Sequence, residues 1–139
     1  MKNLKVILIS TLLFTGCSTT GLKNYNDFAL NINQSSNDNI VIYRSSGFVG
    51  GGTVFTVMLN GLELGKIGTK EFLLGKMQEG KNYIEVKVDG IQGVGLNKPQ
   101  KMLEKNNKNE YFKVGYMGLD ANIYIEEISF EEFKSLSQN

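Results

Sequence analysis

Hydrophobic and polar residues alternate along most of the chain after residue 39, which is typical of strands whose two faces have different surroundings. In "NYIEVKVDG", Ile84, Val86 and Val88 point to one face and the charged residues between them point to the other. Further β-type runs are "IVIYR" (40–44), "TVFTVMLN" (53–60), "KEFLLGKM" (70–77), "KMLEK" (101–105), "EYFKVGY" (110–116) and "ANIYIEEI" (121–128). "DFALNIN" also alternates, which is consistent with a first strand at 27–33.

Turn signals separate these runs at short intervals. Asn60-Gly61 stands between two apolar runs, a strong hairpin signal because both residues tolerate positive φ. Near the carboxyl end, Ser129 is followed three residues later by Glu132, which forms a capping box and predicts a helix start. The pattern predicts an all-β domain over 39–139: a single antiparallel β-sandwich of about seven or eight short strands with a short C-terminal helix.

The amino terminus has a different pattern. Lys2 and Lys5 precede an apolar run at 6–14, and small residues and Cys17 follow it. This order is typical of a secretory signal peptide, and the run is shorter than the roughly 20 apolar residues that span a bilayer. "FTGC" resembles the bacterial lipobox, in which the cysteine thiol is diacylated. A free cysteine beside a cleaved signal is the alternative, but exported thiols are usually paired and Cys17 is the only cysteine.

Residues 1–16 are therefore predicted to be a lipoprotein signal peptide. Residues 17–38 are predicted to hold the lipidated Cys17 and a polar tether to the domain. Two or three acyl chains would attach the protein stably to a membrane, whereas one gives only marginal binding. Ser18 follows the cysteine in place of the Asp that retains lipoproteins at the inner membrane. By resemblance to that sorting rule, we expect the outer membrane, with the domain facing the periplasm.

Composition narrows the possible chemistry. Residues 1–16 hold two of the 15 basic residues, so the remaining chain carries 13 against 14 acidic ones, and no nucleic-acid partner is expected. The chain has no histidine, and lipidation would consume its only thiol. Ser-His-Asp and Cys-His catalysis are excluded, as are zinc sites built on those residues. We expect no cofactor, no metal and no catalytic residues.

Arg44, the only arginine, stands at the end of the predicted strand 40–44 and precedes the glycine-rich stretch "GFVGGGT". A guanidinium there could bind a carboxylate or phosphate bidentately, which makes Arg44 the candidate ligand contact. The alternative, which the frequency of isolated ion pairs favours, is a surface ion pair that holds the loop. The stretch itself lacks the Lys-Ser/Thr and the following helix of a phosphate-binding loop, so we interpret it as a flexible connection between strands.

One group of acidic side chains and one group of tyrosines are candidates for ligand binding. The acidic residues are Glu126, Glu127, Glu131 and Glu132, and the tyrosines at strand positions are Tyr43, Tyr111, Tyr116 and Tyr124. The acidic group lacks the spaced loop of a calcium site, so a solvated face with helix N-terminal charges is favoured. The tyrosines could stack on sugars, but alternating strand positions favour core or cross-strand packing.

The segment "IVIYRSSGFVGGGTVFTVMLNGLELGKI" resembles the opening of a family of small bacterial lipoproteins, domain of unknown function 2846, which is related to PEGA-type β domains. The matching positions, in order, are Tyr43-Arg44, Gly47, Asn60-Gly61, Gly80 and Tyr111-Phe112, and the resemblance covers about residues 39–128. It implies the same β fold and no enzymatic activity. The sequence departs from the family at one turn, with Gln78 and Glu79 in place of prolines and Asn82 in place of a histidine, which questions how rigid that turn is.

These observations favour a non-catalytic, membrane-anchored envelope lipoprotein whose domain binds an envelope protein or glycan partner. Two alternatives stay open. One is a carboxylate-based hydrolase that acts on an envelope glycan or peptide, because any two carboxylates could face each other in a fold. The other is a structural component of the envelope.

Overall fold

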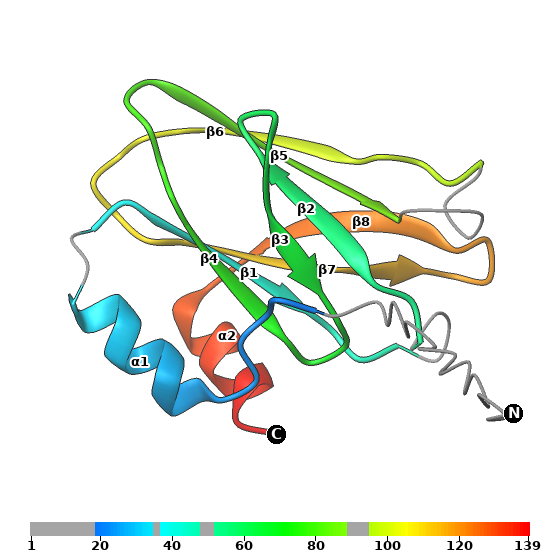
Figure 1. Cartoon of the computed structure of the whole chain (residues 1–139), viewed down its shortest axis with the longest axis horizontal. Coiled ribbons are helices and arrows are strands. Elements are labelled where there is room, and N and C mark those ends of the chain that lie inside the picture. Colours follow the sequence, from blue (N-terminus) through cyan, green and yellow to red (C-terminus); the bar gives the residue numbers. More distant parts are fainter. Residues whose placement is uncertain (1–18, 35–36, 48–51, 89–94) are drawn as a thin grey trace, which may run out of the picture.

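The computed structural model describes residues 19–34, 37–47, 52–88 and 95–139. Within these ranges the chain forms eight strands and two helices (Figure 1). Their bounds are α1 Tyr25–Gln34, β1 Asn39–Arg44, β2 Phe55–Leu59, β3 Leu62–Ile67, β4 Phe72–Lys76, β5 Lys81–Val88, β6 Gln100–Glu104, β7 Glu110–Met117, β8 Asn122–Ile128 and α2 Phe130–Ser137.

The strands form two four-stranded sheets packed face to face. One has the order β4-β1-β7-β8 and is called here the helix-covered sheet; the other, the opposite sheet, has the order β3-β2-β5-β6. Neighbouring strands are antiparallel except β1 and β7, which are parallel. The predicted all-β sandwich with a short C-terminal helix is confirmed. The parallel pairing of β1 with β7 was not predicted, because the alternation of residues within a strand does not show the direction of its neighbours.

The core between the sheets is built from the alternating positions of both. Its fully or almost fully buried members include Ile40, Ile42, Phe55, Val57, Ile84, Val86, Phe112 and Val114. The alternation predicted for β5 is confirmed, because Ile84, Val86 and Val88 are buried there. Strand β1 is buried along its whole length, which its continuous apolar run allows.

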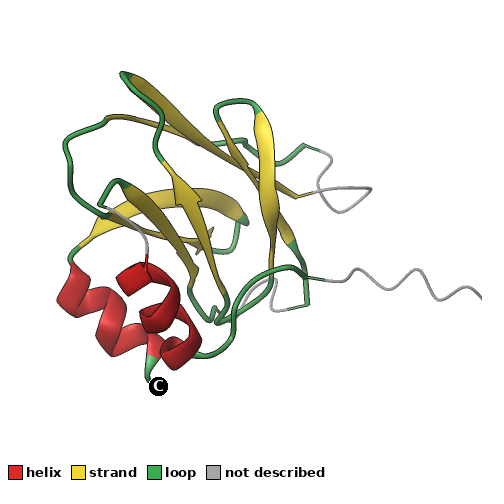
Figure 2. Ribbon diagram, turned by 60° about the vertical axis from the view of Figure 1, so that its left-hand side comes forward, coloured by secondary structure: helices red, strands yellow, loops and turns green. Residues whose placement is uncertain are grey.

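A second core fills the outer side of the helix-covered sheet. Phe28 of α1 and Phe133 of α2 are fully buried and pack against Val41, Tyr43 and Phe72 of the sheet. The rings of Phe28 and Phe133 lie 4.8 Å apart between centroids, in an edge-on arrangement. Figure 2 shows both helices gathered on one side of the sandwich. The domain therefore has three layers: helices, helix-covered sheet and opposite sheet.

The strand expected at 27–33 is wrong, because these residues lie in the helix α1. Tyr25, Phe28 and Ile32 follow one another at helical spacing and all contact the second core. Leu30, which alternation would bury beside Phe28, is 62% exposed. The Asn24 side chain accepts a hydrogen bond from the Asn26 N–H at 2.9 Å, in the manner of a helix N-cap.

The predicted boundary between tether and domain also needs correction. Residues 19–34, expected to belong to a polar tether over 17–38, fold onto the domain, since Phe28 is fully buried and Leu22 forms a bridge with Phe72 of β4. The predicted signal peptide (1–16) and Cys17 lie outside the described residues. Among the residues described, no helix is long and apolar enough to cross a membrane.

Two local predictions are confirmed. Asn60 and Gly61 have φ of 53° and 79° and connect β2 to β3, as the hairpin signal requires. The Ser129 hydroxyl accepts a hydrogen bond from the Glu132 N–H at 3.1 Å and caps α2.

The buried ring of Phe28 provides a test of the helical layer. Phe28→Ala should lower the free energy of unfolding by about 3–5 kcal/mol, because it leaves a cavity between α1, α2 and β4. Leu30→Ala in the same helix is the matched control and should cost less than about 1 kcal/mol, since that side chain is mostly exposed. Chemical denaturation measures both. Equal effects would contradict the placement of α1.

Candidate functional site

The chain enters the domain along the edge formed by β3 and β4. The Thr20 N–H donates to the Lys66 carbonyl at 2.8 Å, and Leu22 and Phe72 exchange two backbone hydrogen bonds of 2.7 and 3.0 Å. We call residues 19–22 the N-terminal clasp. The clasp fixes the point at which any preceding segment leaves the domain.

A buried carboxylate holds the clasp in place. Glu71 is 4% exposed and accepts hydrogen bonds of 2.8 Å from the Thr19 hydroxyl and from the Gly68 N–H. Lys23 Nζ lies 3.3 Å from the same carboxylate. A buried charge is costly without such partners, so the three donors offset the desolvation of Glu71. Glu71 thereby links the turn before β4 to the clasp.

Two glycines allow the clasp to lie flat on the sheet edge. A Cβ on Gly65 would stand 2.5 Å from the Thr20 hydroxyl oxygen, and one on Gly21 would stand 2.7 Å from a Glu71 carboxylate oxygen. Both distances are shorter than real Cβ contacts, so any side chain at either position would push the clasp away from β3 and β4.

Arg44 lies inside the domain, with 2% of its surface exposed. Its guanidinium donates to the carbonyls of Thr53 and Ile67 and stands 4.0 Å from the centroid of the Phe55 ring. Burial lowers its pKa from the ordinary arginine value, while Tyr116 and then Glu71 act in the opposite direction. The guanidinium thus ties the end of β1 to Thr53 and to the end of β3. The surface position expected for Arg44 is wrong, because its side chain is buried. Its role as a ligand contact stays a prediction, and a ligand would have to compete with the carbonyls of Thr53 and Ile67 for the guanidinium.

The four tyrosines do not form one platform. Tyr43 and Tyr111 pack in the second core beneath the helices. The Tyr116 hydroxyl lies 3.0 Å from the Thr53 hydroxyl, and the Tyr124 hydroxyl lies 3.0 Å from that of Ser45. Core and cross-strand packing, the favoured interpretation, describes all four.

The acidic group near the carboxyl end is organised by a lysine. Lys113 Nζ lies 2.8 Å from Glu126 and 3.0 Å from Glu132, which ties β7 to β8 and to α2. Its hydrogen bond to Glu126 is the main cause that raises the pKa of Lys113 above its ordinary value, so the amine is protonated at neutral pH. Within the described ranges, no group of three or more Asp, Glu, Cys or His side chains is arranged to hold a metal ion.

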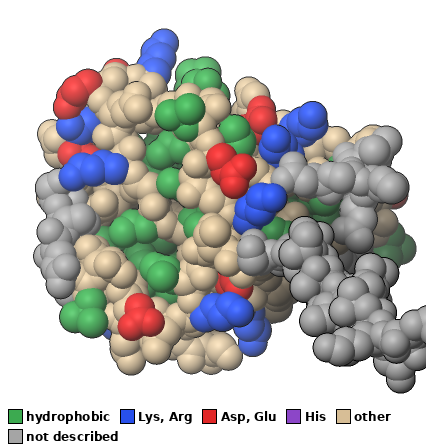
Figure 3. All heavy atoms as spheres, viewed as in Figure 1, with side chains coloured by type: hydrophobic (Ala, Val, Ile, Leu, Met, Phe, Trp, Pro, Cys, Tyr) green, Lys and Arg blue, Asp and Glu red, His purple; other side chains and the backbone are tan. Residues whose placement is uncertain are grey.

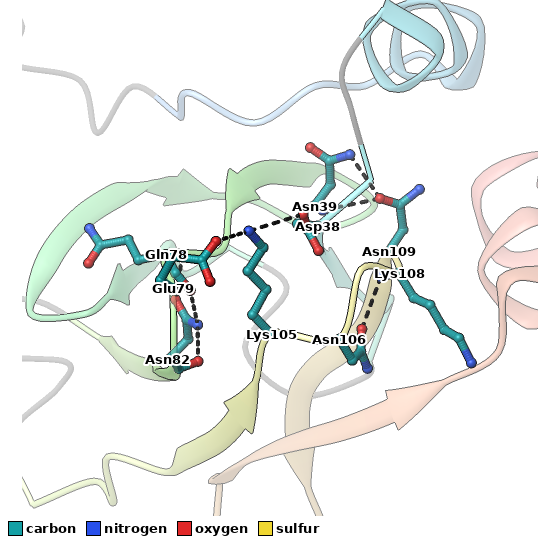
Figure 4. Close-up of polar contacts among 10 residues, drawn as sticks. Asp38, Asn39, Gln78, Glu79, Asn82, Lys105, Asn106, Lys108 and Asn109 are labelled. Carbon is teal, nitrogen blue, oxygen red and sulfur yellow. Dashed lines mark hydrogen bonds and ion pairs between the residues drawn. The ribbon is translucent and has the colours of Figure 1, made fainter.

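A polar network closes the end of the sandwich that lies away from the clasp (Figure 4). Lys105 forms ion pairs with Glu79 and, at 3.5 Å, with Asp38. The hydrogen bond to Glu79 raises the pKa of Lys105, which keeps the amine charged. The Asn109 side chain accepts from the Asn39 N–H at 3.1 Å. The network joins the turns that precede β1, β5 and β7, and a protonated amine there is not a base or nucleophile.

The turn at 78–80 is held by a buried amide. The Asn82 side chain accepts from the Gln78 N–H at 2.8 Å and donates to the Gln78 and Gly80 carbonyls at 2.9 and 3.1 Å. It also accepts from the Asn60 amide at 2.9 Å, which links this turn to the β2–β3 hairpin. The Asn82 side chain therefore fixes the conformation of this turn.

An exposed apolar surface lies on the outer side of β5 and β6. Tyr83 and Met102 stand opposite each other in the β5–β6 pair and are 41% and 68% exposed. Beside them is a hollow of about 230 Å³, lined by Lys81, Met102, Leu103 and Glu104. We call these five residues the Tyr83–Met102 surface. Among the strands that the structure describes, β6 is the last of its sheet and pairs with β5, so the hollow lies at the edge of that sheet.

Sequence reasoning missed this surface, although a signal for it exists. Tyr83 occupies the same alternating positions as Glu85 and Lys87, the charged face of β5. An aromatic residue on a charged face indicates either a covered face or a contact surface. Figure 3 shows that basic and acidic side chains are interspersed with hydrophobic ones on the face it presents.

Comparison of the chain with protein-family models, with curated proteins and with solved structures found no match.

The buried carboxylate of the clasp can be tested by removing its charge alone. Glu71→Gln should lower the free energy of unfolding by about 1–3 kcal/mol, because its hydrogen bonds lose their ionic character in a buried site. It should also accelerate amide hydrogen exchange at residues 20–22. Glu63→Gln, at an exposed position on β3, is the control. Unchanged exchange at the clasp would show that Glu71 does not hold it.

Proposed function

We propose that this protein is a non-catalytic envelope lipoprotein, acylated at Cys17, whose domain binds a protein or glycan partner near the membrane. The basic start, the apolar run at 6–14 and the single cysteine support acylation and removal of residues 1–16. Ser18 favours the outer membrane, with the domain in the periplasm. The resemblance of residues 39–128 to the domain of unknown function 2846 family, whose members are small bacterial lipoproteins, is a further argument for this proposal.

The observation that carries the binding role is the position of the Tyr83–Met102 surface. Across the opposite sheet, Lys66 beside the clasp pairs with Thr56 of β2, and Thr56 pairs with Lys87 of β5. Tyr83 lies four residues before Lys87 along β5. Four residues of strand span about 13 Å, so this surface stands well away from the point of attachment. A partner can therefore reach it while the domain is held at a membrane.

The chemistry of the surface is that of a contact surface. Exposed Tyr and Met side chains are enriched in protein interfaces, where they supply apolar area with a polar rim. Here Lys81 and Glu104 supply that rim. Tyr83 also presents a ring of the kind that stacks on sugars. A protein segment and a glycan are thus both compatible with this surface.

Three observations support the absence of catalysis. The amines of Lys105 and Lys113 are held protonated by carboxylates. The buried carboxylate of Glu71 is engaged by three donors in the fold. The exposed surface just defined contains Lys81 and Glu104 but no pair of facing carboxylates. Turnover of peptidoglycan, polysaccharide or peptides that disappears on mutation of one carboxylate would overturn the proposal in favour of a hydrolase.

Acylation is tested at the cysteine. Cys17→Ser should abolish metabolic labelling with fatty acid and prevent processing of residues 1–16, because the thiol is the only acceptor of its kind. Ser18→Ala, the neighbouring substitution, should leave both unchanged. Labelling that persists in Cys17→Ser would contradict the anchor.

The binding surface is tested by site-specific photo-crosslinking in the native envelope. A photoreactive residue at Met102 should capture one partner, and the same residue at Leu30, which is 62% exposed on α1 against 68% for Met102, should not. With the captured partner purified, Tyr83→Ala should weaken binding by about tenfold or more, as expected of an aromatic anchor. Equal capture at both positions, or unchanged affinity, would remove the binding role from this surface.

A further inference from the structure

The β7–β8 hairpin extends beyond the rest of its sheet. The last pairing of β1 with β7 joins Arg44 to Val114, whereas β7 continues to Met117 and pairs there with Asn122 of β8. Three further residues of strand reach about 10 Å past the end of β1. The turn between the strands has positive φ at Gly118 and Ala121. The tip is thus a projecting feature, visible in Figure 1.

The projecting tip carries apolar side chains in contact with solvent. Leu119 is 90% exposed and Met117 is 62% exposed. Met117 also lines a hollow of about 560 Å³ on the hairpin, together with Tyr116, Gly118, Tyr124, Ile125 and Glu126. A single exposed leucine is ordinary on the surface of a protein. The position of the tip in the fold is therefore needed to infer what Leu119 contacts.

The tip lies at the same end of the sandwich as the chain entry. Thr19 is bonded to Glu71, whose carbonyl accepts from the Arg44 N–H at 2.9 Å. The next residue, Ser45, donates from its N–H to the Val114 carbonyl at 3.0 Å, at the base of the hairpin extension. The clasp and the hairpin are therefore at opposite edges of one sheet, and both are at the end where β1 finishes.

The distance from the clasp to the acylated residue is short. Cys17 stands two residues before Thr19, and two residues of fully extended chain span at most about 7 Å. An acyl chain on Cys17 enters the bilayer at its surface, so the membrane must lie close to this end of the sandwich. The hairpin, which overhangs the same end, then meets the lipid interface.

We propose that Met117 and Leu119 insert into the lipid interface as a second, non-covalent contact beside the acylated Cys17. This inference rests on the acylation proposed above. Apolar side chains at a loop tip gain by entering the boundary between headgroups and acyl chains, and the neighbouring Asp120 carboxylate stays at headgroup level. Two separated contacts fix the orientation of the domain. The end with the Asp38–Lys105 network and the Tyr83–Met102 surface then points away from the bilayer.

The absence of tryptophan from the chain permits a direct test. Leu119→Trp creates a single fluorescent reporter at the tip. Leu62→Trp is the matched control, because Leu62 is 71% exposed but lies beside the Asn60-Gly61 hairpin at the other end of the sandwich. Both processed lipoproteins are reconstituted into phosphatidylethanolamine–phosphatidylglycerol vesicles with brominated acyl chains. The tryptophan at 119 should shift to the blue and lose about half its emission, since interfacial residues sit about 5–10 Å deep, and that at 62 should do neither.

The outcomes separate the two proposals. Mass spectrometry of each purified protein reports acylation at Cys17, and without it the proposed function fails. If the lipid is present and the tryptophan at 119 is quenched no more than that at 62, the hairpin contact is wrong while the anchor stands. Strong quenching at both positions would overturn the proposed orientation, because the domain would then lie with its long side on the bilayer. Denaturation midpoints close to that of the parent protein confirm that both exposed positions tolerate the ring.

Discussion

The structure depends on the burial of strand β1 from both sides. Ile40 and Ile42 face the opposite sheet, while Val41 and Tyr43 face the helices. A strand that is apolar on both faces requires a covering layer on each. The opposite sheet supplies one layer, and α1 with α2 supplies the other. Since α1 precedes β1 and α2 follows β8, segments from both sides of β1 in the sequence are needed to cover it.

Two charged side chains in the interior are also held by contacts between separate segments of the chain. Arg44 ends β1 and Glu71 precedes β4, and both are almost fully buried. Arg44 donates to the carbonyls of Thr53 and Ile67. Glu71 is held by the distant Thr19 and Lys23 and by the nearby Gly68 N–H. Their charges therefore specify where residues 19–23 lie on the domain and where Thr53 and Ile67 lie beside the end of β1, in addition to any stability they contribute.

The two ends of the sandwich differ in a way that suits a membrane-attached domain. One end receives the chain and carries the overhanging apolar tip at Met117 and Leu119. The other end is closed by the polar network of Asp38, Glu79 and Lys105, with the Tyr83–Met102 surface nearby. Under the proposed function, the first end meets lipid and the second meets a partner. The domain would thus act as a short, oriented spacer between the two.

The sequence by itself determined the features that depend on neighbours in the chain. The strands after residue 39, the Asn60-Gly61 hairpin and the Ser129 cap follow from alternation, turn chemistry and capping, and these predictions are confirmed. The prediction of a strand at 27–33 failed because Phe28 and Ile32 satisfy both a period of two and a period near 3.6, and only the aromatic pocket beside Phe133 decides between them.

Tertiary structure alone decided the remaining features. The parallel pairing of β1 with β7 joins segments about 70 residues apart, and nothing in either segment specifies its partner. Whether Arg44 is exposed or buried depends on the carbonyls of Thr53 and Ile67, which the fold brings to it. The exposure of Tyr83 and of Leu119 depends on which faces and edges the other layers leave uncovered. These properties are set by contacts between distant segments, because burial and partner choice belong to the packed chain and not to any one stretch of it.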